Sequence, residues 1–355
     1  MGLPRAPVSA IIERPPGPLA VTDEAAARMI SYSQNFEDVV LDRVFRDTDR
    51  GFYVDVGAND PDVCSVTRHF YESGWRGINV EPGLVYDKLA AARPRDVNLQ
   101  LAASDRAGDV PFYEFPGADG LAGLSPEVPE PFRPLADRRF SRTVRAVPLR
   151  DILTQHAAPR IDFLSIDVEG HEREVLLGND WGRFRPRVVL VEATLPATQV
   201  PCHDRWEDVL VSAGYLFAYF DGLNRFYVRR EDETLLERFA APPNVFDGFV
   251  PAEVVALRDR VLSLEADLRG VSDHRDELTR AHDRLADLLA DRDALLAGTG
   301  RRSLALGLWV ARTLNRLRAL TRVQKAPARV AGAVVRSWRV AVGRTAANRA
   351  GALTR

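Results

Sequence analysis

The sequence predicts an α/β fold in which an open, mostly parallel sheet carries helices on both of its faces. Strand-like runs of apolar residues alternate with helix-like patterns from residue 51 to residue 213, as in sheets built from βαβ units. Two further apolar runs, 215–220 and 225–229, flank Asp221-Gly-Leu-Asn224 and predict a closing hairpin with one antiparallel strand at the sheet edge. We therefore expect one large α/β domain at residues 29–250.

The elements of this domain follow a Pro-rich segment, residues 1–28, that predicts a flexible leader. Strands are expected near residues 51–57, 76–81, 97–102, 161–167 and 187–193. Helices are expected near residues 36–46, 62–73, 84–92, 148–156, 172–178 and 204–213. Residues 110–147 interrupt the alternation with many Pro and Gly residues, and we interpret them as an inserted arm or lid.

The pattern changes at Pro251, where apolar residues begin to follow a three-four spacing. The seam consists of Leu257, Val261, Leu264, Leu268, Val271, Leu278, Leu285, Leu289 and Leu296. Arg275, His282 and Arg292 lie in the same register, and such polar breaks fix the pairing of helices at some cost in stability. Residues 251–298 are therefore predicted to form a coiled coil that self-associates or pairs with a partner coil.

The last segment, residues 299–355, predicts basic amphipathic helices. Residues 301–355 hold 13 Arg or Lys and no Asp or Glu, whereas the whole chain has a net charge of −2. Because basic side chains near anionic lipid each contribute about 1 kcal/mol, we expect this tail to contact an anionic membrane surface or to dock on an acidic partner. No aromatic residues interleave with basic ones on the expected sheet, so no specific nucleic-acid binding is predicted.

Composition restricts the cellular setting. A chain of 355 residues with 46% hydrophobic content can bury a large core. Its two cysteines, Cys64 and Cys202, favour a reducing compartment over a disulfide framework. With neither a secretory signal pattern nor a run of 18 apolar residues, we expect a cytoplasmic protein that can lie peripherally at the inner face of the membrane.

A turn after the first strand predicts the kind of cofactor. Dinucleotide folds need Gly-x-Gly-x-x-Gly beside a pyrophosphate, whereas this turn reads Gly57-Ala-Asn-Asp-Pro-Asp62, with one Gly and two acids. S-adenosylmethionine has no phosphate and carries an ammonium and a sulfonium, so an acidic turn suits it. The next strand ends in Glu81, where a carboxylate can hold a ribose diol. These features favour methyl transfer over hydride transfer.

Three motifs in order give a resemblance to a known family. They are Ser33-Gln-Asn-Phe-Glu-Asp38, Phe52-Tyr-Val-Asp-Val-Gly-Ala-Asn59 with Glu81-Pro82, and Ile166-Asp-Val-Glu-Gly-His-Glu172. In these motifs the chain, over about residues 30–250, resembles the FkbM family of S-adenosylmethionine-dependent O-methyltransferases. The resemblance implies a Rossmann-like, seven-stranded class I methyltransferase sheet. It also implies transfer of a methyl group to a hydroxyl, commonly on a sugar or a polyketide-type product.

Cofactor contacts are expected at the ends of the first strands. Gly57 would let the backbone approach the ligand, while Asp55 and Asn59 would hold its methionine end. Glu81 would accept two ribose hydroxyls, and Pro82 would flank the adenine. Each such charge-assisted hydrogen bond contributes on the order of 1.5–3 kcal/mol.

Further cofactor contacts are expected from segments outside this turn. Ser104 and Asp105 follow the third strand and are predicted to meet the adenine edge. The resemblance adds Gln34 and Glu37 as lid contacts over the cofactor.

The acceptor side is predicted at Asp167, Glu169 and His171. Removing the proton of a hydroxyl needs a carboxylate, a His, or a metal that acidifies the alcohol, and this stretch offers all three, with Glu192 as a further ligand. We do not expect a dedicated metal site. The prediction is an O-methyltransferase acting on a sugar, a glycan or glycolipid precursor of polysaccharide biosynthesis, or a secondary metabolite. The alternatives are a non-catalytic methyltransferase-like scaffold and, less favoured, an NAD-dependent oxidoreductase.

Overall fold

The computed structural model describes residues 29–116, 119–126, 133–134, 137–297 and 309–316. The chain forms two compact units, Met1–Leu257 and Arg258–Arg355. The predicted leader and almost all of the predicted basic tail lie outside the described residues.

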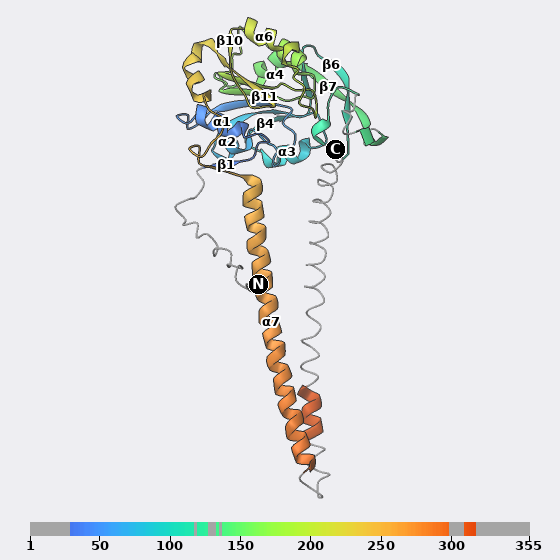
Figure 1. Ribbon diagram of the computed structural model, residues 1–355. Helices are drawn as coiled ribbons and strands as arrows, with labels where there is room; N and C mark the ends of the chain where they lie inside the picture. The colour runs from blue at the N-terminus through green and yellow to red at the C-terminus, as the bar shows by residue number, and fades with distance from the viewer. Residues whose placement is uncertain (1–28, 117–118, 127–132, 135–136, 298–308, 317–355) are drawn as a thin grey trace, which may run out of the picture. The chain divides into compact units, whose positions relative to one another are not determined.

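The first unit is built on a seven-stranded sheet, which confirms the α/β prediction (Figure 1). The strands are β2 (Phe52–Val56), β3 (Arg76–Val80), β4 (Val97–Leu99), β8 (Phe163–Ile166), β9 (Val188–Glu192), β10 (Tyr215–Phe220) and β11 (Asn224–Arg229). They lie in the order β10-β11-β9-β8-β2-β3-β4. Only β11 runs opposite to the other six strands. It is second from the edge rather than at the edge as predicted, because the hairpin folds β11 back between β9 and β10.

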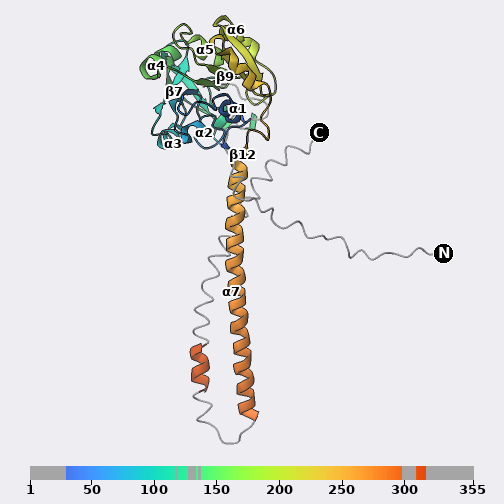
Figure 2. The ribbon, with the colours of Figure 1, turned by 90° about the vertical axis from the view of Figure 1, so that its left-hand side faces the viewer.

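Helices cover both faces of this sheet. They are α1 (Glu37–Val44), α2 (Arg68–Glu72), α3 (Tyr86–Ala92), α4 (Leu149–His156), α5 (Glu172–Leu177) and α6 (Glu207–Ser212), with short 3-10 helices η4 (His203–Arg205) and η5 (Arg230–Phe239). Because side chains alternate along a strand, β2 feeds two cores: Val54 and Val56 pack with α4, α5 and α6, and Tyr53 packs with α1, α2 and η5. Figure 2 shows α4, α5 and α6 on one side of the unit and α1 and α2 on the other.

The segment predicted as an arm forms a second sheet. This sheet contains β5 (Ala102–Ser104), β6 (Gly108–Glu114) and β7 (Phe140–Pro148), in the order β5-β7-β6. The short helix η2 (Asp119–Leu121) lies between β6 and β7 in the chain. The strand expected at 97–102 is therefore two strands, β4 in the large sheet and β5 in the small one. Phe112 and Val144 form a small core with Ala102, so the arm is anchored to the domain by its own packing.

The helix expected at 62–73 is limited to α2, residues 68–72. Residues 61–67 form a loop in which Cys64 is exposed and has φ 57°. A buried cation holds this loop: Arg93, at the end of α3, donates to the carbonyl oxygen of Pro61 (2.8 Å) and to Ser65 Oγ (3.3 Å). This bond across about 30 residues of sequence competes with local helix formation.

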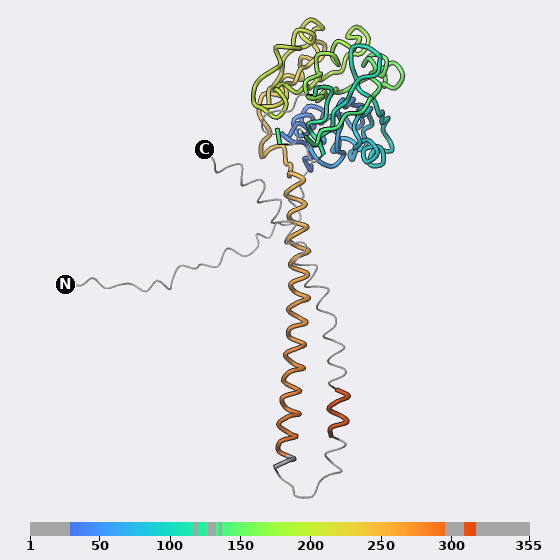
Figure 3. The backbone as a smooth tube through the Cα atoms, turned by 90° about the vertical axis from the view of Figure 1, so that its right-hand side faces the viewer, coloured from blue at the N-terminus to red at the C-terminus, as the bar shows by residue number. Residues whose placement is uncertain are grey.

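A two-stranded parallel ladder joins the two ends of the first unit. β1 (Met29–Ser31) pairs with β12 (Phe249–Pro251), in the register Met29 to Phe249. Directly after β12, the helix α7 (Ala252–Ala297) continues without a break, as Figure 3 shows.

Seven of the nine seam residues predicted in α7 are exposed on the single chain, and Leu285 is half-buried. Leu257 is 65% exposed, Val261 52% and Leu268 68%. Pairing of this helix with a second coil stays a prediction. Within the described residues, no helix has both the length and the apolar content needed to cross a membrane.

A glycine in β3 provides a test of the core. A Cβ added at Gly77 would lie 2.1 Å from the Tyr53 ring, and that ring stacks on Phe163 with centroids 5.7 Å apart. Gly77→Ala should lower the free energy of unfolding by about 1–3 kcal/mol, because overpacking forces the ring to move. Urea denaturation measures this. Gly108→Ala, where a Cβ meets nothing within 4 Å, is the matched control; equal effects of the two variants would contradict the packing argument.

Candidate functional site

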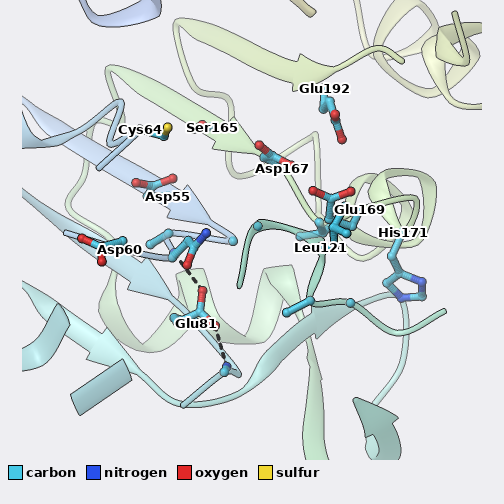
Figure 4. Close-up of a pocket in the computed structure, with 18 of the residues that line it drawn as sticks. Asp55, Asp60, Cys64, Glu81, Leu121, Ser165, Asp167, Glu169, His171 and Glu192 are labelled. Atoms are coloured by element: carbon cyan, nitrogen blue, oxygen red, sulfur yellow. Dashed lines mark hydrogen bonds between the residues drawn. The ribbon is translucent and has the colours of Figure 1, made fainter. Parts of the chain in front are cut away.

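A cavity of about 960 Å³ opens at the carboxyl ends of β2, β3, β8 and β9 (Figure 4). This is the edge at which parallel α/β sheets bind ligands. Eight carboxyl side chains line the cavity, and no Lys or Arg is among its described lining residues. The carboxyl groups belong to Glu37, Asp55, Asp60, Glu81, Glu114, Asp167, Glu169 and Glu192. The wall therefore favours cationic ligands and disfavours phosphates.

The turn predicted after β2 is present, but Gly57 is needed there for a packing contact as well as for approach of a ligand. Gly57 has φ 87° and Asn59 has φ 46°, both in the left-handed region that Gly and Asn tolerate best. A Cβ at Gly57 would lie 1.7 Å from the carbonyl oxygen of Asp167. Gly57 does line the cavity, but its first role is to let the loop after β8 pack against the turn after β2.

Glu81 is held by backbone amides at the end of β3. One carboxylate oxygen accepts from the amide of Asn59 (2.8 Å), and the other accepts from the amide of Gly83. Burial raises the pKa of Glu81, and these two amides act in the opposite direction. Because an ionised carboxylate offers about four acceptor positions, two remain for a pair of hydroxyls.

Asp55 is the deepest acid of the turn region. Its Oδ2 accepts from the hydroxyl of Thr67 at 2.8 Å, and the residue is only 5% exposed. Burial raises the pKa of Asp55 from 3.8 to about 6, while the Thr67 hydrogen bond acts in the lowering direction. The carboxyl group is thus held in place beside the cavity, and it binds a proton at a higher pH than an ordinary Asp does.

The two residues expected as lid contacts both line the cavity, but they differ in character. Gln34 is exposed. Glu37 is buried and accepts from the Asn224 side chain and the Asn35 amide, both at 2.8 Å. Burial raises the pKa of Glu37 to about 7. Glu37 therefore belongs to the fixed wall rather than to a movable cover.

The contacts predicted for the adenine edge separate in the structure. Pro82 lines the cavity, whereas Ser104 and Asp105 are not among its lining residues. The Ser104 hydroxyl instead lies 3.0 Å from His171 Nε2 and 3.2 Å from Asp105. Ala102 and Ala103, which directly precede Ser104 in β5, line the wall in their place.

The predicted acceptor residues do not all come together. Asp167, Glu169 and Glu192 each offer a carboxylate oxygen, and these oxygens all lie within 4.8 Å of one another. The His171 ring points away from this group in Figure 4, toward Ser104, and its Nδ1 lies 3.4 Å from Glu174. Burial lowers the pKa of His171. We refer to Asp167, Glu169 and Glu192 as the carboxylate cluster.

A sharp turn, rather than an extended strand, brings Asp167 and Glu169 together. β8 ends at Ile166, and Glu169 and Gly170 have φ 54° and 97°. Glu172 fixes this turn, because its Oε1 accepts from the amide of Gly170 at 2.9 Å. The two side chains thus converge because of this turn, and not because they alternate along a strand.

The cluster carries strong mutual repulsion. Burial, followed by the charges of its acidic neighbours, raises the pKa of all three carboxyl groups well above the ordinary range. Glu169 Oε2 and Glu192 Oε2 are buried and accept no hydrogen bond from the described residues. Asp167 is the member most open to the cavity.

Some wall residues were not predicted from the sequence. Glu114, at the end of β6, accepts from the Leu84 amide at 2.8 Å and from Arg142 at 3.0 Å. Residues 120–124 of the arm also line the cavity. Like Glu81 and Glu192, Glu114 is an acid at the end of a strand, and this position was the only feature of the sequence that could have indicated its role.

The raised pKa of Asp55 predicts a pH dependence of stability in the ligand-free protein. Below pH 3.8 the carboxyl is protonated in both states, so its full contribution is present. As pH rises toward 6 the unfolded state ionises first, and stability falls by about 3 kcal/mol. Asp55→Asn should lack this loss.

The measurement is the free energy of unfolding from pH 4 to pH 7 for the wild type and for Asp55→Asn. Asp151→Asn, at an exposed position in α4, controls for removal of one charge. A constant difference between wild type and Asp55→Asn across this range would contradict the assignment.

The chain is similar to a known protein family in the region that contains most of the cavity residues. Residues 55–217 match the family model described as the methyltransferase FkbM domain, a range that begins at Asp55 and so does not include Gln34 or Glu37. The search of curated proteins returned no match. The match contains the turn after β2, Glu81 and the carboxylate cluster, so it confirms over residues 55–217 the resemblance to FkbM methyltransferases that the sequence motifs predicted.

Proposed function

We propose that this protein transfers a methyl group from S-adenosylmethionine to a hydroxyl oxygen. The acceptor we propose is a sugar, a glycan or glycolipid precursor, or a secondary metabolite. One observation carries the proposal: a strand-end carboxylate, Glu81, is anchored by two amides in a cavity whose described lining has eight acids and no Lys or Arg. A ligand with a diol and positive charge fits that wall.

The residues present fit this cofactor. Glu81 would accept its two ribose hydroxyls with the acceptor positions that the amides leave free. Asp55 and the Asn59 turn lie beside Glu81 and would hold the charged methionine end. Val80, Pro82 and Ala103 supply apolar wall for the adenine ring. When bound, S-adenosylmethionine supplies an electrophilic methyl group.

A dinucleotide fits the same wall poorly. Its pyrophosphate would lie beside Asp55 and Asp60 without a cationic side chain from the described lining. The turn also has one Gly where close approach of a pyrophosphate needs more. These residues therefore favour methyl transfer over an NAD-dependent reaction.

The acceptor hydroxyl would lie at the carboxylate cluster. Asp167 is open to the cavity, and its raised pKa suits a group that takes a proton near neutral pH. A well-placed base contributes typically 10²–10⁴ in rate, and alignment of the reacting atoms contributes several kcal/mol more. His171, bonded to Ser104, would position the loop rather than act as the base.

A non-catalytic scaffold is the second candidate function. The exposed apolar residues of α7 could pair with a partner coil. The basic tail could bind an anionic surface at the inner face of the membrane. Because the cavity keeps all the acids proposed to hold the cofactor and the acceptor, we propose that the protein catalyses methyl transfer in the cytoplasm. The coiled coil and the basic tail would then serve assembly and targeting.

The cofactor assignment is tested at Glu81. Glu81→Gln should weaken S-adenosylmethionine binding about tenfold to a hundredfold, since a charge-assisted hydrogen bond contributes about 1.5–3 kcal/mol and the amide would face a backbone donor. Isothermal titration calorimetry measures the affinity. Glu174→Gln, at a half-buried position of α5 outside the cavity lining, is the matched control. Unchanged affinity in Glu81→Gln would remove the basis of the proposal.

The acceptor side is tested at Asp167. Asp167→Asn should bind S-adenosylmethionine within about threefold of the wild type yet transfer methyl groups at least about a hundredfold more slowly, because a base contributes 10²–10⁴ in rate. The readout is release of S-adenosylhomocysteine with a panel of sugars, nucleotide sugars and glycolipids. Wild-type turnover in Asp167→Asn would show that the cluster does not serve the reaction.

A further inference from the structure

We propose that the carboxylate cluster is a binding site for one hard divalent cation, of the Mg²⁺ or Mn²⁺ type. Asp167 comes from the end of β8, Glu169 from the turn that follows it, and Glu192 from the end of β9. One carboxylate oxygen of each lies within 4.8 Å of the other two. Opposite oxygens around a cation that binds them at 2.0–2.6 Å lie about 4–5 Å apart, so one ion fits this group.

A buried carboxylate oxygen without a hydrogen-bond donor points to the ion. Glu192 is 6% exposed, and its Oε2 accepts no hydrogen bond from the described residues. In Figure 4 this carboxyl group points toward Asp167 and Glu169. Leaving a carboxylate oxygen buried without a partner is costly, and a cation in the cluster would satisfy it.

The surrounding residues provide no other counter-charge. The described lining of the cavity has no Lys or Arg, and the His171 ring is turned toward Ser104. The neighbouring Glu172 does not compensate either, because it is acidic and its Oε1 is occupied by the Gly170 amide. Hard oxygen ligands without nitrogen or sulfur are the set that Mg²⁺ and Mn²⁺ prefer.

Asp167 gives the ion an open side. It is the exposed member of the cluster and faces the cavity, while Glu192 closes the back. A cation held there keeps positions for water or for a substrate oxygen. If the proposed methyl transfer holds, the ion would bind the acceptor hydroxyl and lower its pKa, while Asp167 would hold the ion with one oxygen and take the hydroxyl proton with the other. This last step rests on the proposed function, whereas the binding site itself does not.

The experiment is a Mn²⁺ titration of the full chain, after removal of metals and without cofactor or acceptor, followed by electron paramagnetic resonance of free Mn²⁺. We expect one saturable ion in the wild type, displaced by Mg²⁺. Glu192→Gln should weaken binding about tenfold to a hundredfold, the loss seen even when a residue that only hydrogen-bonds to a metal ligand is changed. Glu81→Gln, an acid of the same cavity outside the cluster, should bind Mn²⁺ as the wild type does.

Thermal unfolding separates loss of the site from loss of the fold. Without metal, Glu192→Gln should be at least as stable as the wild type, because it removes repulsion. Saturating Mn²⁺ should raise the Tm of the wild type and Glu81→Gln only. If Glu192→Gln does not fold, Asp167→Asn, at the open position, replaces it.

Three results would overturn the site: no saturable Mn²⁺ in the wild type, wild-type binding in Glu192→Gln or its replacement, or equal losses in Glu81→Gln. None of these depends on S-adenosylmethionine. Failure here would therefore leave the Glu81 calorimetry unaffected.

Discussion

The approach of Gly57 to the carbonyl oxygen of Asp167 is the constraint on which the site depends. A Cβ at Gly57 would lie 1.7 Å from that oxygen, so no other residue fits without separating the two loops. The loop after β2 leads to Asn59 and its bond to Glu81, and the loop after β8 carries Asp167 and the turn to Glu169. Because β2 and β8 are neighbours in the sheet, this contact fixes the distance between the two halves of the cavity. The position of a methyl donor relative to an acceptor would be set by backbone, which changes less than side chains do.

The acids of the cavity wall divide into two groups by what holds them. Glu81, Glu37 and Glu114 each accept from backbone amides or side-chain donors, and Lys88 pairs with Asp60 at 2.8 Å. These groups keep their shape without a ligand. In the carboxylate cluster, by contrast, Glu169 and Glu192 each have a buried oxygen that accepts no hydrogen bond from the described residues. Most buried polar groups are satisfied in native proteins, so two unsatisfied oxygens that meet in one cluster at the cavity indicate a ligand more strongly than charge alone does.

The sequence predicted what is local to a strand and its end. Alternating apolar runs located β2, β3, β8 and β9, and the acids that follow them reached one sheet edge because parallel strands share a direction. It failed where a distant residue decides the geometry. Arg93 holds the loop at 61–67 that was predicted as helix, and His171 takes the Ser104 hydroxyl that was expected to meet adenine. Periodicity carries no information on partners 28 or 67 positions apart, nor on the left-handed backbone of Glu169.

The arm joins the two halves of the site from outside the sheet. Its strand β6 ends in Glu114, which accepts from the Leu84 amide on the Glu81 side. Its Gly123 bridges to Tyr113 and comes so near the acidic turn that an added Cβ would lie 3.2 Å from the Cβ of Glu169. The arm has its own small core around Phe112, so its loop can change without disturbing the large sheet. Within the part of the chain that the structure describes, the cavity-lining residues 120–122 and 124 would therefore set the size and shape of a bound acceptor, whereas a side chain at Gly123 would press on the carboxylate cluster.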